Sequence, residues 1–94
     1  MTEADRVAME AGELLKGIVG KHKINVTIQG CPPDRLPDEP ERKAAYAFIS
    51  GNSPDKDSLA VETVKTFLEQ AGFAVERYSE RELRIRHGAK KAEA

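Results

Sequence analysis

Four of the chain's five prolines lie between residues 30 and 41. Proline lacks a backbone N–H and its ring collides with the preceding helical turn, so this segment fits neither a helix nor the interior of a sheet. We therefore predict a long, stiff, acidic loop over residues 30–41. A loop of this length within a compact domain is usually functional or disordered. Regular structure is expected only in the two stretches on either side of it.

The stretch before the loop contains a helical pattern followed by a strand pattern. Apolar residues recur three and four positions apart through residues 4–19, which is typical of an amphipathic helix. Thr2 is placed to cap this helix and Gly20 to end it. Residues 23–29 then alternate between polar and β-branched side chains, which predicts a half-buried strand.

The stretch after the loop predicts one helix and three strands. Residues 44–49 fit either a strand or a short helix, and we choose a strand because a run of turn-forming residues follows directly. Residues 55–71 carry apolar side chains on one helical face. Residues 73–78 and 83–87 alternate around a short polar connection, which predicts an antiparallel hairpin.

These elements follow one another in the order αββαββ, which predicts an α+β fold. One-sided strands and helices most simply form a two-layer sandwich, in which both helices cover one face of a four-stranded antiparallel sheet. A circularly permuted ferredoxin-like fold, with its first strand moved to the C-terminus, has the same order and would place residues 44–49 and 83–87 at the centre. A chain of 94 residues has room for one domain. We assign this domain to residues 1–88, with a flexible tail at 89–94.

The sequence indicates neither export nor a membrane segment. Its first residues lack the basic start and apolar run of a secretory signal, and no stretch approaches the ~20 apolar residues that span a bilayer. Cys31 is the single cysteine, so no internal disulfide can form. We therefore expect a cytoplasmic protein that makes no membrane contact.

The sheet face that the helices leave open is expected to be polar and partly basic. Lys23 belongs to the polar side of the first predicted strand, and Arg84 and Arg86 to that of the last. The second strand leaves two registers open. In the register we favour, Tyr46 and Phe48 join the core, because a chain with 5% aromatic residues needs their bulk. In the other register, both rings lie on the open face near the two arginines.

The second register supports an alternative function. Residues 43–49, KAAYAFI, follow a basic-small-aromatic-small-aromatic-aliphatic pattern with one extra alanine, which resembles a strand pattern of RNA-recognition motifs over about seven residues. In that family, aromatic side chains stack on bases and basic side chains contact phosphates. The resemblance implies binding of RNA or another single-stranded nucleic acid by Tyr46, Phe48, Arg84, Arg86 and Lys23. A net charge of -1 does not favour such a partner.

Our principal hypothesis is a small non-catalytic binding or regulatory module that acts through protein–protein contacts. In the proline-rich loop, Leu36 lies between Pro33 and Pro37 and would display an apolar side chain on a semi-rigid arm. The partner would be another protein or a second copy of this chain, which would form a homodimer.

An enzyme with an unrecognised site is the second alternative. His22 and His87 are far apart in sequence, Cys31 is alone, and no metal-binding or phosphate-binding motif occurs. We therefore assign no catalytic, cofactor-binding or metal-binding residue. Acid and base groups from different strands can still converge in a folded chain.

Overall fold

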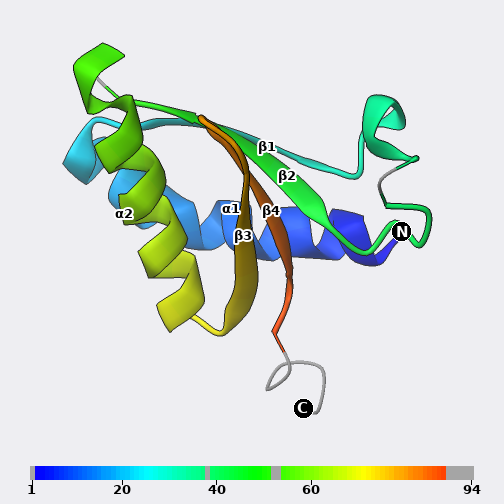
Figure 1. Cartoon of the computed structure of the whole chain (residues 1–94). Coiled ribbons are helices and arrows are strands. Elements are labelled where there is room, and N and C mark those ends of the chain that lie inside the picture. The colour runs from blue at the N-terminus through cyan, green and yellow to red at the C-terminus, as the bar shows by residue number, and fades with distance from the viewer. Residues whose placement is uncertain (1, 38, 52–53, 89–94) are drawn as a thin grey trace.

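The computed structural model describes residues 2–37, 39–51 and 54–88, and Figure 1 shows their arrangement. In this part of the chain the helices and strands follow the predicted order αββαββ, with two short 3-10 helices between them. Their bounds are α1 Glu3–His22, β1 Asn25–Gly30, η1 Pro33–Arg35, β2 Ala45–Ser50, η2 Pro54–Lys56, α2 Asp57–Gln70, β3 Phe73–Ser79 and β4 Glu82–His87. The tail predicted over residues 89–94 lies outside the described residues.

The four strands form one antiparallel sheet in the order β1-β2-β4-β3. β2 and β4 therefore lie at the centre, where the permuted ferredoxin-like hypothesis places residues 44–49 and 83–87, and β1 and β3 form the two edges. Both helices contribute to one core on a single face of the sheet, which gives the predicted two-layer α+β architecture (Figure 1). The permuted ferredoxin-like arrangement stays an interpretation of this strand order.

The core between the helices and the sheet is built from small and aliphatic side chains. β2 presents Ala45, Ala47 and Ile49 to the helices, and all three are fully buried at 0% exposure. The two alanines let the helices lie close to this central strand, where a large ring would not fit the packed layer. Because side chains alternate along a strand, Tyr46 and Phe48 point to the opposite face. The prediction that these two rings belong to the helix-facing core is therefore wrong.

α1 extends further at its C-terminus than predicted. Its start is as expected, because the Thr2 hydroxyl accepts a hydrogen bond from the backbone N–H of Asp5 at 3.2 Å. The helix continues past Gly20 to His22, since basic residues in the last turn interact favourably with the helix C-terminus. Lys23 then ends the helix in the left-handed conformation, with φ 54°. Lys23 is thus a helix cap rather than the first residue of a strand.

The proline-rich segment is also more ordered than expected. Gly30 is the last residue of β1, and Pro33–Arg35 form the 3-10 helix η1, in which proline is well tolerated at the first position. The Glu39 N–H donates to the Arg35 carbonyl at 3.1 Å, and the N–H of Ala4 in α1 donates to the Arg42 carbonyl, also at 3.1 Å. We call residues 31–37 and 39–43 together the covering loop. It lies at the ends of β1 and β2 in Figure 1, beside the start of α1.

Candidate functional site

Tyr46 lies on the open face of the sheet but is shielded from solvent by the covering loop. Its ring stands edge-on to Tyr78, with ring centroids 5.2 Å apart and an interplanar angle of 82°. Cys31 and Leu36 pack in the same cluster, and the Arg35 guanidinium lies 5.8 Å from the centre of the Tyr46 ring. Only 3% of Tyr46 is exposed. This ring is therefore not available to stack on a base in this structure.

Two buried polar atoms under the covering loop have no hydrogen-bond partner among the described residues, namely Arg35 Nε and the Tyr46 hydroxyl. Arg35 uses another nitrogen, Nη2, to bind Glu82 at 2.7 Å. Burial raises the pKa of Tyr46, and the Arg84 guanidinium opposes this shift, although the hydroxyl makes no hydrogen bond of normal geometry with it. An unpaired buried polar group costs about 1–3 kcal/mol. The burial of these two atoms under the covering loop therefore carries a local cost that the other contacts of the loop must offset.

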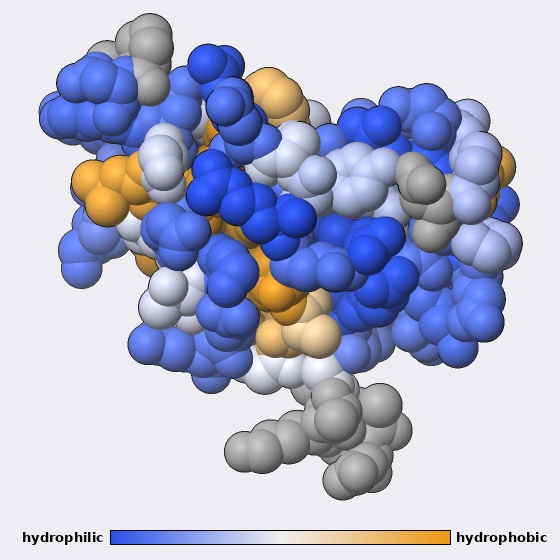
Figure 2. Space-filling model, in the orientation of Figure 1, coloured by the Kyte–Doolittle hydropathy of each residue, from blue (hydrophilic) through white to orange (hydrophobic). Residues whose placement is uncertain are grey.

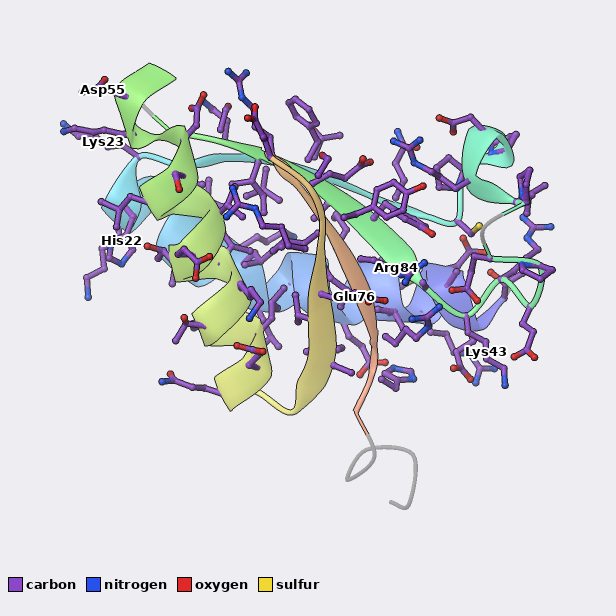
Figure 3. All side chains as sticks on the ribbon, viewed as in Figure 1. His22, Lys23, Lys43, Asp55, Glu76 and Arg84 are labelled. Atoms are coloured by element: carbon purple, nitrogen blue, oxygen red, sulfur yellow. The ribbon has the colours of Figure 1, made fainter. Side chains whose placement is uncertain are left out.

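The two arginines of β4 are already paired with carboxylates. Arg84 Nε donates to Glu76 Oε1 at 2.6 Å, and Figure 3 shows these two labelled side chains close together. Arg86 donates to the same carboxylate oxygen at 3.0 Å and also pairs with Glu39, a buried residue of the covering loop. The hydrogen bond from Arg84 lowers the pKa of Glu76, which keeps this carboxyl ionised at neutral pH. The arginines thus supply little uncompensated positive charge for phosphates.

The other residues expected to bind nucleic acid are dispersed. Phe48 is 52% exposed on the open face and lines a shallow hollow of about 170 Å³. Lys23 lies at the opposite end of β1 from Gln29, the residue that pairs with Tyr46. Figure 3 shows Lys23 far from Arg84. The structure therefore places Tyr46 close to the arginines but leaves Lys23 apart from them.

The covering loop offers a partner less apolar surface than expected. Leu36 is half-buried and packs against the cluster that contains Tyr46. Pro33 and Pro37 are exposed. The right-hand part of Figure 2, over the loop, is largely hydrophilic. The role of these three residues as a protein anchor stays a prediction.

An apolar groove of about 490 Å³ runs between α1 and β1, and sequence reasoning missed it. Its walls include Met9, Gly12 and Val19 of the helix and Val26 and Ile28 of the strand. Met9 is 58% exposed, which is unusual for a large apolar side chain. Gly12 leaves the groove open, because a Cβ atom there would lie 3.5 Å from Ile28 Cγ2, at ordinary contact distance. The sequence does contain a signal for this groove, because Met9 and Gly12 lie beside the main apolar stripe of the helix.

The groove runs alongside the outer edge of the sheet. β1 pairs with β2 on one side, and no described residue forms a backbone hydrogen bond to its other side. Residues 24–30 carry neither a charged side chain nor a proline. Natural edge strands are usually protected by charges, prolines or bulges, because their free N–H and C=O groups can pair with another strand. β1 has none of these protections.

The reactive side chains of the described residues give little support to catalysis. The Cys31 thiol lies 3.9 and 3.8 Å from the carbonyl oxygens of Pro32 and Glu39. Burial and then the charge of Glu39 raise the pKa of Cys31, which disfavours the nucleophilic thiolate. Within the described ranges, no three potential ligands gather to hold a metal ion.

Comparisons of the chain with models of protein families, with curated proteins and with solved structures found no match. Among the described residues, neither helix is long and apolar enough to cross a bilayer. We therefore assign the candidate site from the geometry of the structure alone. It consists of the bare edge of β1 and the apolar groove between that strand and α1, and we call it the β1 edge site.

Proposed function

We propose that the chain is a protein-binding module that accepts an additional β-strand along the outer edge of β1. The observation that carries this proposal is an unprotected edge strand lying directly beside an apolar groove. The proposed function is recognition of a partner and includes no catalytic step.

Strand addition would use both parts of the β1 edge site. The free N–H and C=O groups of β1 would hydrogen-bond to the backbone of the incoming strand, which supplies affinity with little dependence on sequence. Alternate side chains of that strand would point toward the helix layer. The apolar groove, with Met9 at its surface, would select apolar residues at those positions.

The alternative, nucleic-acid binding on the open face, has weaker support. It requires Tyr46 and the arginines of β4 to contact the ligand, but the ring is covered and the arginines bind Glu76 and Glu39. Uncovering Tyr46 would require the covering loop to move away, which would break the ion pairs of Arg86 with Glu39 and of Arg35 with Glu82. Phe48 is exposed on that surface, but Arg35, which lines the same hollow, already pairs with Asp34 and Glu82.

The test is a nuclear magnetic resonance titration of the full chain with a peptide that copies residues 24–30. We expect the shifts to change at the amides of β1 and at Gly12 and Val19 in the groove. A control peptide methylated on alternate backbone nitrogens should bind more weakly, because it cannot complete the ladder. Met9→Lys should also weaken binding without changing the fold, since this side chain is exposed.

Two outcomes would contradict the proposal. One is a peptide titration that leaves the amides of β1 unchanged while the chain also shows no association through this edge. The other is a parallel titration with single-stranded RNA that shifts Phe48 and the amides of β4, weakens with salt, and is matched by no effect of the peptide. The second result would favour the nucleic-acid alternative.

A further inference from the structure

We infer that the strand that fits the β1 edge site is β1 of a second copy of this chain, paired antiparallel about a two-fold axis at Thr27. This inference rests on the proposed function and adds the identity of the partner. The two sheets would join into one continuous sheet, with the two α1 helices side by side above it.

The side chains of β1 complement themselves in this arrangement. An axis at Thr27 places Thr27 opposite its own copy, Asn25 opposite Gln29, and Val26 opposite Ile28. Polar groups then meet polar groups on the open face, and apolar groups meet apolar groups on the helix side. With no charge on the strand, nothing on β1 repels the second copy. An isologous interface requires this kind of self-complementarity.

The position of α1 relative to β1 adds a charge argument. Gly12 lies level with Ile28, because a Cβ on Gly12 would touch the Ile28 side chain. Two residues along the strand span about 6.8 Å, which equals between four and five residues of helix. Since α1 and β1 run in opposite directions, Val26 lies level with Lys16 or the residue after it. Thr27 therefore lies level with the segment of α1 between Gly12 and Lys16.

Two opposite charges line the groove at this level of the helix, Glu13 and Lys16. A two-fold axis at Thr27 makes the two α1 helices antiparallel, so Glu13 of each copy faces Lys16 of the other. Within one copy the two side chains form an ion pair of 3.0 Å, with 72% of Glu13 and 74% of Lys16 exposed. An exposed pair of this kind contributes little by itself, so its groups are free to bind across an interface.

This pattern also favours a second copy over an unrelated peptide. Glu13 and Lys16 lie on opposite sides of the two-fold axis. After the rotation, the negative group of one copy therefore faces the positive group of the other. A peptide whose charges have one sign would be attracted by one of these groups and repelled by the other. The exposed Met9 side chain and the half-buried Val26 and Ile28 would lose contact with water when the second copy closes over the groove.

The test is the mass of the full chain in solution, measured by sedimentation over a range of concentrations. We expect a reversible dimer of the 10.4 kDa chain. Glu13→Lys alone and Lys16→Glu alone should each weaken dimerisation about tenfold, because two attractive contacts become repulsive. The double reversal Glu13→Lys with Lys16→Glu should restore it. Both positions are exposed, and circular dichroism should show an unchanged fold.

The matched control is Glu69→Lys, which reverses a charge in the exposed ion pair between Lys65 and Glu69 on α2. It should leave the dimer unchanged. A chain that stays monomeric at millimolar concentration would overturn the inference, as would a dimer that ignores the single reversals. If the chain is monomeric but the peptide of residues 24–30 still shifts the amides of β1, the proposed function stands without a second copy as partner.

Discussion

The two edges of the sheet differ in how they meet solvent. β3 carries the charged residues Glu76 and Arg77 and has a register irregularity between Arg77 and Ser79. The Arg77 guanidinium also occupies backbone acceptors, because it donates to the carbonyls of Ser79 at 3.3 Å and Glu80 at 2.8 Å. β1, in contrast, carries no charged side chain. It pairs with β2 in a regular register of six residue pairs, and an apolar groove lies beside it.

This difference shows that the fold protects one edge and leaves the other suited to pairing. Charges and bulges are the usual means by which proteins prevent edge-to-edge association. On the β3 side, ion pairs continue across the open face through Glu76 and Arg86 to Glu39 of the covering loop. On the β1 side no described charge plays such a role. The contrast points to association through β1.

The largest predicted effect concerns the ion pairs of the protected side. Glu39→Gln should lower the free energy of unfolding by about 1–3 kcal/mol, because it removes the buried carboxylate that pairs with Arg86 and leaves this guanidinium with Glu76 alone. Urea unfolding measures this change. The control Glu41→Gln alters an exposed pair with Lys43 and should change stability very little. Equal effects of the two variants would show that the covering loop is not held by Glu39.

The next prediction concerns a charged side chain placed on β1, of the kind that protects the β3 edge. Thr27→Lys should weaken self-association about tenfold, because two lysines would then lie opposite one another at the two-fold axis. Thr27 is exposed, so the monomer should keep its stability. The matched control is Ala74→Lys, an exposed position on β3, which should leave association unchanged. The comparison between the edges fails if both variants behave alike.

A third prediction concerns the groove beside β1. Gly12→Ala should raise the free energy of unfolding by about 1 kcal/mol, because alanine favours a helix and the added Cβ meets Ile28 at 3.5 Å. Gly30→Ala should lower it, because a Cβ there would lie 2.4 Å from Asp5 Oδ1 and 3.1 Å from the backbone carbon of Ala4. Thermal unfolding of both variants checks the two signs. A stabilising Gly30→Ala would contradict the close approach of α1 to the end of β1.

The smallest predicted effect is a pH dependence on the β3 side. The pKa of Glu76 in the folded chain lies below its ordinary value of 4.5, because Arg84 hydrogen-bonds to the ionised carboxylate. Its stabilising contribution is therefore fully present above pH 4.5 and is lost as the pH falls through the lower folded-state pKa. Glu76→Gln should flatten stability against pH in that acid range, by less than about 1 kcal/mol because the carboxylate is half exposed. An unchanged pH profile would exclude this pair as a source of stability.

The order and approximate bounds of the helices and strands could be predicted from the periodicity of the sequence. The face of the sheet to which the side chains of β2 point could not. The helical repeat of residues 4–19 and the alternation of residues 23–29 depend on local sequence, so both elements occur close to where they were expected. The register of β2 was open because an alternation of alanine with aromatic residues satisfies either face. That choice depends on how close the helices approach, which is a tertiary property.

The candidate site was less accessible to sequence reasoning. The covering loop looked like a connector because its prolines exclude regular ladders, and its sequence gave no indication that Glu39 pairs with Arg86. The groove depends on a missing side chain at Gly12, and on the edge position of β1, which follows from the strand order. Neither can be seen in a local pattern. The lack of charge over residues 24–30 was visible, but it acquires meaning only when the strand lies at an edge.

Cross-linking tests the central claim most directly. In a Cys31→Ala background, Thr27→Cys places one cysteine on β1, and Ala74→Cys places a matched cysteine on β3. Directly opposed residues of antiparallel strands have Cα atoms roughly 4.5–5.5 Å apart, within the range that a disulfide can bridge. We predict that mild oxidation links two copies rapidly through Thr27→Cys and not through Ala74→Cys. No link at Thr27→Cys, or equal links at both positions, would contradict pairing of two copies through β1.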